Sequence, residues 1–152
     1  MPASDHIRRL REKIGHELLL VPSVCVLPRD EQGRVLLVRL ADTGRWGTIG
    51  GAIEVDEDPR DAAVREAKEE AGVVVELGPI LGVLGGPDYR ITYSNGDLAA
   101  YVSIVYDATV RSGVPTPDGD ETIDVGWFTP AEMAAADIGH FVRAMLRDLY
   151  LT

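Results

Sequence analysis

The sequence predicts an α/β fold in which helices cover both faces of a central β-sheet. Segments rich in apolar and β-branched residues, typical of strands, alternate along the chain with segments that carry helix start and stop signals. The length of 152 residues suits one domain, and no internal repeat or linker divides it. With 45% hydrophobic and 26% charged residues, the composition is that of a globular protein. We therefore expect residues 1–152 to form a single domain.

A short amphipathic helix is expected at the start of the chain, over residues 4–14, within an appended segment 1–15. Ser4 is a suitable N-cap, and Gly15 closes the helix. Its apolar residues recur on one narrow face: Ile7, Leu10 and Ile14. Because so short a helix is not stable alone, it must dock on the body of the protein or on a partner subunit.

Two strands are predicted next. The first is the apolar run Leu18 to Leu27, which Pro22 is expected to interrupt or kink. Polar turn residues at 28–33 separate it from a second strand at 34–40, so the two strands are a hairpin candidate. Residues 41–45 then form a loop, and residues 46–53 lead into the most informative stretch of the chain.

That stretch contains a helix with signals at both ends. Asp58 suits the N-cap, Pro59 the first helical position and Gly72 the stop. On the helical wheel, one arc collects the apolar residues Ala63, Val64, Ala67 and Ala71, and another collects the carboxylates Glu66, Glu69 and Glu70. Spacings of i, i+3 and i+4 make the three carboxylates neighbours on one face, where they repel one another.

Strands dominate the second half of the chain. We expect a strand at 73–75, a turn at 76–79 and a continuation at 80–84. A short strand at 89–93 and a hairpin turn through Asn95-Gly96 lead to the clearest strand of this half. The remaining elements are that strand at 98–110, a loop at 112–120, a strand at 122–128, a helix opened by a capping box from Thr129 to Glu132, and a C-terminal helix at 138–150.

Charge and cysteine content limit the classes of function. The net charge of −10 and pI of about 4.7 disfavour binding to nucleic acid or to an anionic membrane. Cys25 is the single cysteine, so no intrachain disulfide can form, and its apolar surroundings predict a buried thiol. The chain begins with charged residues rather than a signal peptide, and no apolar run approaches the ~20 residues that span a bilayer. We expect a cytoplasmic protein.

The acidic cluster belongs to a longer pattern. Residues 51–73 fit Gly-x5-Glu-x7-Arg-Glu-Ala-x-Glu-Glu-x-Gly-Val without exception, from Gly51 through Glu57 and Arg65 to Val73. This resembles the Nudix box, the signature of hydrolases that cleave nucleoside diphosphates linked to another moiety. The resemblance implies a Nudix-type α/β/α sandwich with a mixed β-sheet. It makes a functional acidic cluster a better interpretation than a solvated acidic face.

Carboxylate clusters suit hard divalent cations, above all Mg²⁺, with Mn²⁺ as a substitute. We expect Glu66 and Glu70 to be the principal metal ligands, and Glu69 to complete the cluster or to accept the proton of the attacking water. By resemblance, the Gly-Gly loop adds a backbone carbonyl from Gly50 or Gly51. Paired metals can screen a diphosphate, orient a water and stabilise the leaving phosphate.

Further site residues follow from the same resemblance. Arg65 and Glu57 take structural roles in the family, and a guanidinium can hold neighbouring carboxylates in place. An acidic residue of a later loop often joins such sites; the candidates here are Glu121, Asp120 and Asp118, with Glu121 six residues before Trp127. The chain departs from the family where Ile49 replaces a common proline.

The substrate is less clearly encoded. Arg39 and Arg45 could reach substrate phosphates. A base or a sugar could be contacted by Trp46, Tyr89, Tyr93 and Tyr101, although packing is the more frequent role of each. Two enzymatic readings remain open: a pyrophosphatase of ADP-ribose or nucleotide sugars, and a nucleoside triphosphate pyrophosphatase that clears modified nucleotides. A nucleotide-binding sensor is a third, and it predicts lost carboxylates that this box retains. A homodimer through residues 4–14 or the 93–97 turn also stays open.

Overall fold

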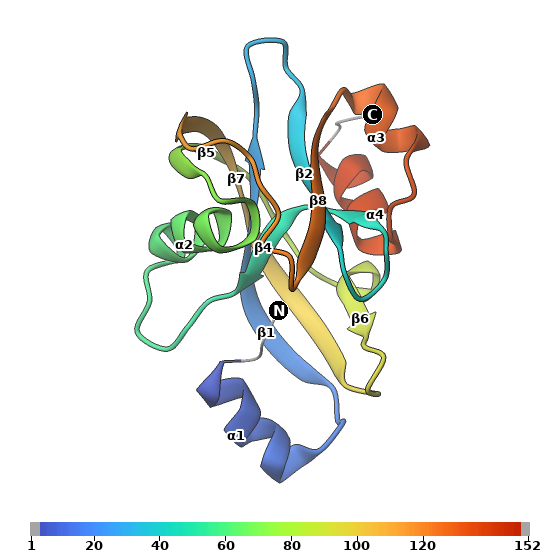
Figure 1. Ribbon diagram of the computed structural model, residues 1–152. Helices are drawn as coiled ribbons and strands as arrows, with labels where there is room; N and C mark the ends of the chain where they lie inside the picture. The colour runs from blue at the N-terminus through green and yellow to red at the C-terminus, as the bar shows by residue number, and fades with distance from the viewer. Residues whose placement is uncertain (1–3, 150–152) are drawn as a thin grey trace.

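The computed structural model describes residues 4–149 and confirms the α/β class (Figure 1). Its helices are α1 (Asp5–Ile14), α2 (Pro59–Ala71), α3 (Pro130–Ala135) and α4 (His140–Asp148), with a short 3-10 helix η1 (Pro87–Tyr89). Its strands are β1 (Leu19–Pro28), β2 (Val35–Leu40), β3 (Trp46–Gly47), β4 (Ile49–Ala52), β5 (Val74–Leu84), β6 (Arg90–Thr92), β7 (Leu98–Ser112) and β8 (Thr122–Phe128). In the described residues, no helix is long and apolar enough to cross a membrane.

The strands form two sheets. The larger is mixed, as expected: its order is β4-β1-β7-β5, with β6 paired to β7, and β1 and β7 run parallel while the other pairs are antiparallel. The smaller sheet is antiparallel, in the order β3-β2-β8. Figure 1 shows α2 on one side of the strands and α3 and α4 on the other, which gives the predicted three-layer arrangement.

Two buried clusters form the core. One packs the alanines of α2 against one face of the strands, and the other packs α3 and α4 against the opposite face. β2 contributes to both, because Leu36 and Val38 belong to the first cluster while Val35 and Leu37 belong to the second. Successive residues of a strand point to opposite faces, so the apolar run at residues 35–38 can contribute to a core on each side.

The predicted hairpin between the first two strands is wrong. β1 and β2 lie in different sheets and share a single bridge between Arg29 and Val35. β1 pairs along its whole length with β7, while β2 pairs with β3 and β8. Residues 23–28 of β1 and 35–38 of β2 are buried on both faces, and each strand has a neighbour from a distant part of the chain.

Pro22 does not interrupt β1. The Pro22 carbonyl accepts a hydrogen bond from Ile53 N–H at 3.0 Å, so the position of its missing N–H also faces the β4 side of the strand. The paired register of β1 with β4 ends at Ser23, so Pro22 lies at the end of this ladder, where a proline is tolerated. The turn predicted at 76–79 is likewise absent. β5 runs through it with register shifts between Leu77 and Gly82.

Most predicted helix ends are confirmed. Ser4 caps α1, Asp58 caps α2, and Gly72 ends α2 in the left-handed conformation. The Thr129 capping box of α3 is complete, with reciprocal hydrogen bonds to Glu132. The hairpin turn at 94–97 joins β6 to β7 as expected. The C-terminal helix starts later than predicted, at His140, and residue 150 of the predicted range lies outside the described residues.

Candidate active site

α2 buries two of its three clustered carboxylates. Glu66 is 0% exposed and Glu70 is 5% exposed, whereas more than half of the Glu69 side chain is exposed. The predicted separation of an apolar and an acidic arc is therefore wrong. Val64 is exposed, and the buried arc combines Glu66 and Glu70 with small residues: Ala62, Ala63, Ala67 and Ala71. Small neighbours leave the two carboxylates close to the sheet beneath them.

Gly50 lies directly beside Glu70. Its N–H donates to Glu70 Oε1 at 2.9 Å. A Cβ at Gly50 would lie 2.3 Å from the carbonyl oxygen of Val24, so only glycine fits this close approach to β1. Gly50 and Gly51 belong to β4 and pair with β1, which corrects the expectation that they form a loop.

Burial disfavours the charged forms of both inner carboxylates. Burial raises the pKa of Glu70, and the charges of Glu66 and Glu121 raise it further, while the Gly50 hydrogen bond opposes the shift. Burial also raises the pKa of Glu66, against the opposing effect of Arg65. Two buried carboxyl groups this close cannot both remain charged without a cation to compensate them.

Arg65 holds the carboxylates around it. Its Nε and one terminal nitrogen donate to the two oxygens of Glu57, at 2.8 and 2.9 Å. The other terminal nitrogen donates to Glu66 Oε1 at 2.9 Å and to Glu69 Oε2 at 3.3 Å. A further bond reaches the Ala52 carbonyl at 3.2 Å. The pKa of Arg65 is raised by these partners, chiefly Glu57, so the guanidinium stays charged.

The side chains suit a divalent cation, although they do not form a complete set of metal ligands. Within residues 4–149, no three His, Cys, Asp or Glu side chains converge with metal-ligand geometry. Arg65 occupies the space between Glu66 and Glu69. Yet Glu66 Oε2 is buried and, among the described residues, has no hydrogen-bond partner. An orphaned carboxylate oxygen among further carboxylates is the donor set that hard divalent cations prefer.

The loop at 113–121 brings further acidic residues to the end of α2. Thr122 Oγ1–H donates to the Glu70 carbonyl at 2.8 Å, and Thr116 N–H donates to the Ala71 carbonyl at 2.9 Å. Asp118 Oδ1 accepts the backbone N–H groups of Asp120, Glu121 and Thr122, so this side chain organises the turn. Of the three acidic candidates, Asp120 and Glu121 reach the cavity described next.

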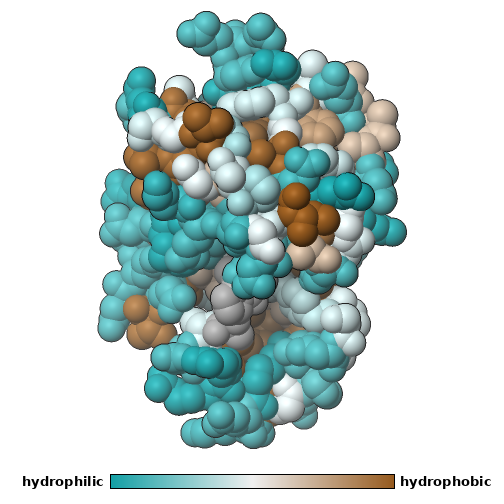
Figure 2. Space-filling model, in the orientation of Figure 1, coloured by the Kyte–Doolittle hydropathy of each residue, from teal (hydrophilic) through white to brown (hydrophobic). Residues whose placement is uncertain are grey.

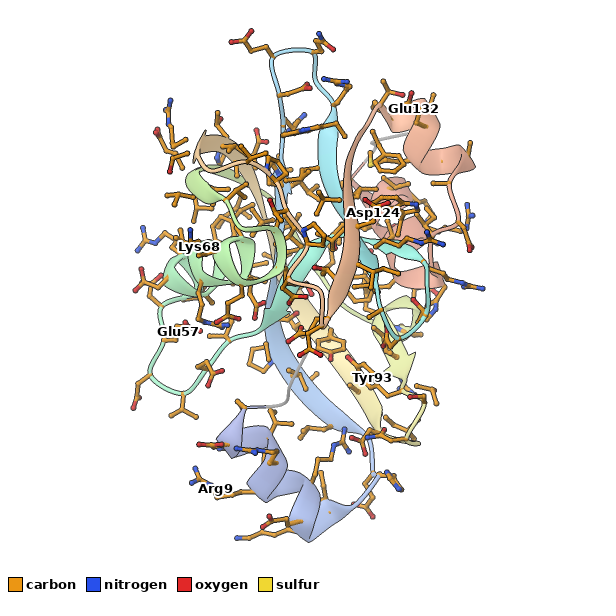
Figure 3. All side chains as sticks on the ribbon, in the orientation of Figure 1. Arg9, Glu57, Lys68, Tyr93, Asp124 and Glu132 are labelled. Atoms are coloured by element: carbon orange, nitrogen blue, oxygen red, sulfur yellow. The ribbon has the colours of Figure 1, made fainter. Side chains whose placement is uncertain are left out.

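A cavity of about 900 Å³ lies beside Glu70 and the acidic loop 113–121. What we call the carboxylate lining consists of Glu70, Asp120 and Glu121, next to Gly50 and Gly51. What we call the aromatic lining consists of Trp46, Tyr93, Tyr101 and Phe141. Figure 3 labels Glu57 on the α2 side of the molecule and Tyr93 on the β6 side. The cavity thus joins a charged surface to an aromatic one.

The aromatic lining is supported by ring contacts. Trp46 meets Phe128 edge to face at a centroid distance of 4.8 Å, and Tyr101 meets Phe141 at 6.1 Å. The hydroxyl of Tyr93 is hydrogen-bonded to that of Tyr101. These contacts hold flat apolar surfaces in place, which suits stacking against a planar ligand.

Sequence reasoning missed several lining residues. Phe141, His140, Thr48 and the buried pair Ser23 and Ser103 all border the cavity. The Ser23 and Ser103 hydroxyls are hydrogen-bonded at 2.5 Å. Alternation along β1 and β7 predicts that these serines share a face, but only the parallel register between the strands places them opposite one another.

The predicted substrate-binding residues do not all reach the cavity. Arg45 and Trp46 line it, with Arg45 Nε 3.6 Å from Asp137 Oδ1. Arg39 is absent from the lining, and its Nε donates to the Gly44 carbonyl at 2.8 Å, which supports the loop before β3. Tyr89 is also outside the cavity, where its hydroxyl donates to Asp148 at 2.6 Å.

The sequence is similar to that of a known protein family and of several known relatives. A family model for the NUDIX domain matches residues 19–149. A MutT-like protein of Streptomyces ambofaciens is 35% identical over 68% of this chain and 60% of its own length. Nucleoside triphosphatase NudI of Salmonella arizonae is 30% identical over 82% of this chain and 92% of its own length. Human diphosphoinositol polyphosphate phosphohydrolase 2 is 44% identical over 70% of this chain and 56% of its own.

The fold has solved counterparts. A MutT protein from Methanosarcina mazei superposes with a TM-score of 0.73 at 23% identity, covering 88% of this chain and 94% of that one. The chain spans only 56 to 60% of the length of two of the relatives named above, so their whole-protein properties do not carry over directly.

Proposed function

The chain belongs to the NUDIX family of hydrolases, and on that premise we propose that it is a divalent-metal-dependent pyrophosphohydrolase of nucleoside triphosphates. Pyrophosphohydrolase chemistry needs carboxylates next to the phosphates, and a nucleotide needs a flat apolar surface for its base. The observation that carries the proposal is one cavity in which Glu70 and Glu121 adjoin Trp46, Tyr93 and Tyr101.

The lining favours a nucleotide over a diphosphoinositol polyphosphate, although one relative is named for that substrate. An inositol ring carrying many phosphates needs several cationic side chains around it. Among the described residues that line the cavity, Arg45 is the single lysine or arginine. A nucleoside instead places an uncharged, planar base against the aromatic lining, where stacking is favourable.

Two observations decide which class of nucleotide is proposed first as the substrate. The relative that this chain covers almost completely is named a nucleoside triphosphatase, which supports a triphosphate substrate. The cavity volume of about 900 Å³ is near the top of the usual range for ligand sites, about 300–1,000 Å³, which leaves room for a second sugar. Hydrolysis of ADP-ribose or a nucleotide sugar is therefore the second candidate.

NUDIX hydrolases generally use divalent metals, and we infer Mg²⁺ here, with Mn²⁺ as a substitute. Glu66 and Glu70 would hold it, together with Glu69 and a backbone carbonyl of Gly50 or Gly51. The orphaned oxygen of Glu66 supports this assignment. When bound, the cation would screen the phosphate charge and make a bound water more acidic.

The protein's own residues would then orient the metal-binding carboxylates and accept a proton from the attacking water. Arg65 fixes Glu66 and Glu57 through charge-assisted hydrogen bonds, so that Glu66 keeps one geometry through the reaction. Water attacks a substrate phosphorus, the bridging P–O bond breaks, and a nucleoside monophosphate and pyrophosphate leave. The proton of the water passes to a carboxylate, for which Glu121 and Glu69 are the candidates.

A substrate panel tests the proposal. The protein, with Mg²⁺ and then with Mn²⁺, is assayed on nucleoside triphosphates, ADP-ribose, nucleotide sugars and a diphosphoinositol polyphosphate, and the products are identified by mass spectrometry. We expect pyrophosphate from a nucleoside triphosphate and no turnover after chelation. Preferred turnover of the inositol compound contradicts the nucleotide assignment. Tight nucleotide binding without any hydrolysis indicates the sensor instead.

A further inference from the structure

α1 stands apart from the body of the protein. No residue of this helix is buried, and Figure 1 shows it set off from the sheets. Its attachment is concentrated on Arg11, whose guanidinium donates to the carbonyls of Glu17 at 2.7 Å and Leu98 at 2.8 Å. The apolar stripe of an amphipathic helix is normally covered, so this one remains only partly satisfied.

An exposed apolar surface lies beside the helix, on the larger sheet. This surface, here called the apolar strip, consists of Leu18, Leu20, Pro22, Val83, Leu98 and Val102. Leu20 is 68% exposed and Val83 is 63% exposed. Leu20 pairs with Ala100 and Pro22 with Val102, so even-numbered residues of β1 and β7 share one face.

The strip continues the face of the sheet that α2 covers. Further along the same strands and on the same face, Val24 and Ile104 pack in the cluster beneath α2. Within residues 4–149, no helix covers the Leu20 half. Contiguous apolar surfaces of this kind mark interaction sites more often than isolated apolar residues do.

Opposite charges flank the strip. At one end, Arg11 ties α1 to Leu98, and α1 carries four basic and two acidic residues in a chain of net charge −10, which gives it the mostly hydrophilic surface seen in Figure 2. At the other end, Ile53 N–H donates to Pro22 and opens the loop 54–58. That loop exposes Glu54 and Asp56, with the exposed apolar Val55 between them. Figure 3 labels Arg9 on the helix and Glu57 on the loop.

We propose that this face binds a second copy of the chain. A twofold axis through the apolar strip places the basic α1 of each copy against the acidic loop 54–58 of the other, so that both charge pairings form at once. The strips of the two copies then cover one another and exclude water.

The net charge of the chain favours a second copy over an anionic membrane as the partner of this face. A basic amphipathic helix also suits an anionic membrane surface. A membrane, however, would meet the acidic loop and the remainder of a chain with net charge −10. A second copy presents the helix with the acidic surface that it lacks, and presents the acidic loop with a basic helix. The interface would also adjoin Glu57, which holds Arg65.

Sedimentation velocity of the full chain tests the proposal over about 1 to 100 µM, a range that detects micromolar dimers. We expect a dimer that weakens as salt rises. Leu20→Glu should weaken it by about 30-fold or more, because it buries a charge at the centre of the interface. The matched control is Val114→Glu, at an exposed apolar residue of the loop 113–121, and it should leave the dimer intact.

Charge reversal tests the arrangement itself. Arg9→Glu should weaken the dimer about 10-fold, and combining it with Glu54→Arg should restore most of the loss, because the reversed pair again attracts. Circular dichroism shows whether each variant is folded. A wild-type chain that stays monomeric over the whole range overturns the proposal. So does an equal response to Leu20→Glu and Val114→Glu. Binding of wild type to phosphatidylserine vesicles, lost in Arg9→Glu, indicates a membrane partner instead.

Discussion

The two linings of the cavity are assembled in different ways. Glu70 of the carboxylate lining and the residues that support it come from one stretch, in which Gly50, Arg65 and Glu70 lie within 21 residues of one another, while Asp120 and Glu121 join it from the loop 113–121. The aromatic lining comes from four separate segments, since Trp46, Tyr93, Tyr101 and Phe141 belong to β3, the β6–β7 turn, β7 and α4. The α2 part of the carboxylate lining is local in sequence, whereas the aromatic lining exists only after folding.

This difference determines how substitutions in each lining are expected to affect hydrolysis of different substrates. A helix fixes the spacing of its carboxylates by itself, so the spacing of Glu66, Glu69 and Glu70 does not depend on long-range contacts. The aromatic surface depends on the packing of α4 and on ring contacts such as that of Tyr101 with Phe141. We therefore expect substitutions in the carboxylate lining to affect all substrates alike, and substitutions in the aromatic lining to affect some substrates more than others.

The largest effect is expected from Glu70→Gln. Glutamine keeps the shape of the side chain and an acceptor for Gly50 N–H, but it removes the negative charge proposed to hold the cation. We expect kcat to fall about 1,000-fold on every substrate that the wild type hydrolyses, because a charge-stabilising ligand is lost. Steady-state kinetics on two different nucleotides measures this.

The control for that variant is its thermal stability. Glu70 is buried and its pKa is raised by burial, so a neutral glutamine is not expected to lower Tm in the metal-free protein. A loss of turnover on one nucleotide but not the other would contradict the assignment of Glu70 to the shared chemistry.

Arg65→Lys is expected to have the next largest effect. Lysine cannot make the paired hydrogen bonds to Glu57 while also reaching Glu66, so both carboxylates lose their fixed orientation. We expect kcat to fall about 10- to 100-fold, the usual cost of losing such a support. The free energy of unfolding should fall by about 2 kcal/mol from the lost charged hydrogen bonds.

Differential scanning calorimetry and kinetics on the same sample separate the two consequences. If stability falls while kcat is unchanged, Arg65 serves the fold alone and does not position Glu66. Raising the Mg²⁺ concentration should recover part of the activity of this variant, because poorly oriented ligands weaken metal binding rather than abolish it.

The sequence predicted the local part of this site well. The ends of α2, at Asp58 and Gly72, follow from capping chemistry that acts within a few residues. Structural roles for Arg65 and Glu57 were expected from the family resemblance, but the hydrogen bond between the two residues was not predicted. The deep burial of Glu66 and Glu70 was not predicted, because it depends on β4 lying against β1, where Gly50 contacts Val24.

The long-range part was predicted poorly, for one physical reason. β1 was expected to pair with the next strand in sequence, but it pairs with β7, about 80 residues away. Local propensity contains no information about which distant strand completes a sheet. The same limit hid Ser103 and Phe141, which reach the cavity only because β7 and α4 pack where they do.

Trp46→Leu tests the aromatic lining, which is expected to affect substrate binding more than the chemical step. Leucine keeps an apolar contact with Phe128 but removes the flat surface proposed to stack on a base. Loss of stacking, about 1–3 kcal/mol per base, should raise KM about 10-fold for the preferred nucleotide, with kcat within a few-fold of wild type. An equal fall in kcat for every substrate would place Trp46 with the carboxylate lining instead.

The smallest effect concerns Cys25, a further residue that lines the cavity. Burial raises the pKa of this thiol from 9.0 to about 11, against weaker opposing hydrogen bonds from Thr48 and Ser103. Since the thiolate is the reactive form, we expect alkylation by iodoacetamide at pH 9 to be at least about 50-fold slower than in the unfolded chain. Mass spectrometry of the intact protein follows the reaction.

The same shift has a defined sign for stability. A thiol whose pKa is higher in the folded state than in the unfolded state stabilises the fold at low pH, and this contribution is lost as the pH rises from 9.0 through about 11. Cys25→Ala removes the titrating group, so its stability should depend less on pH in that window than that of the wild type. Rapid alkylation of the native protein at pH 9 would show that the region around Cys25 opens more readily than the 5% exposure of this residue indicates.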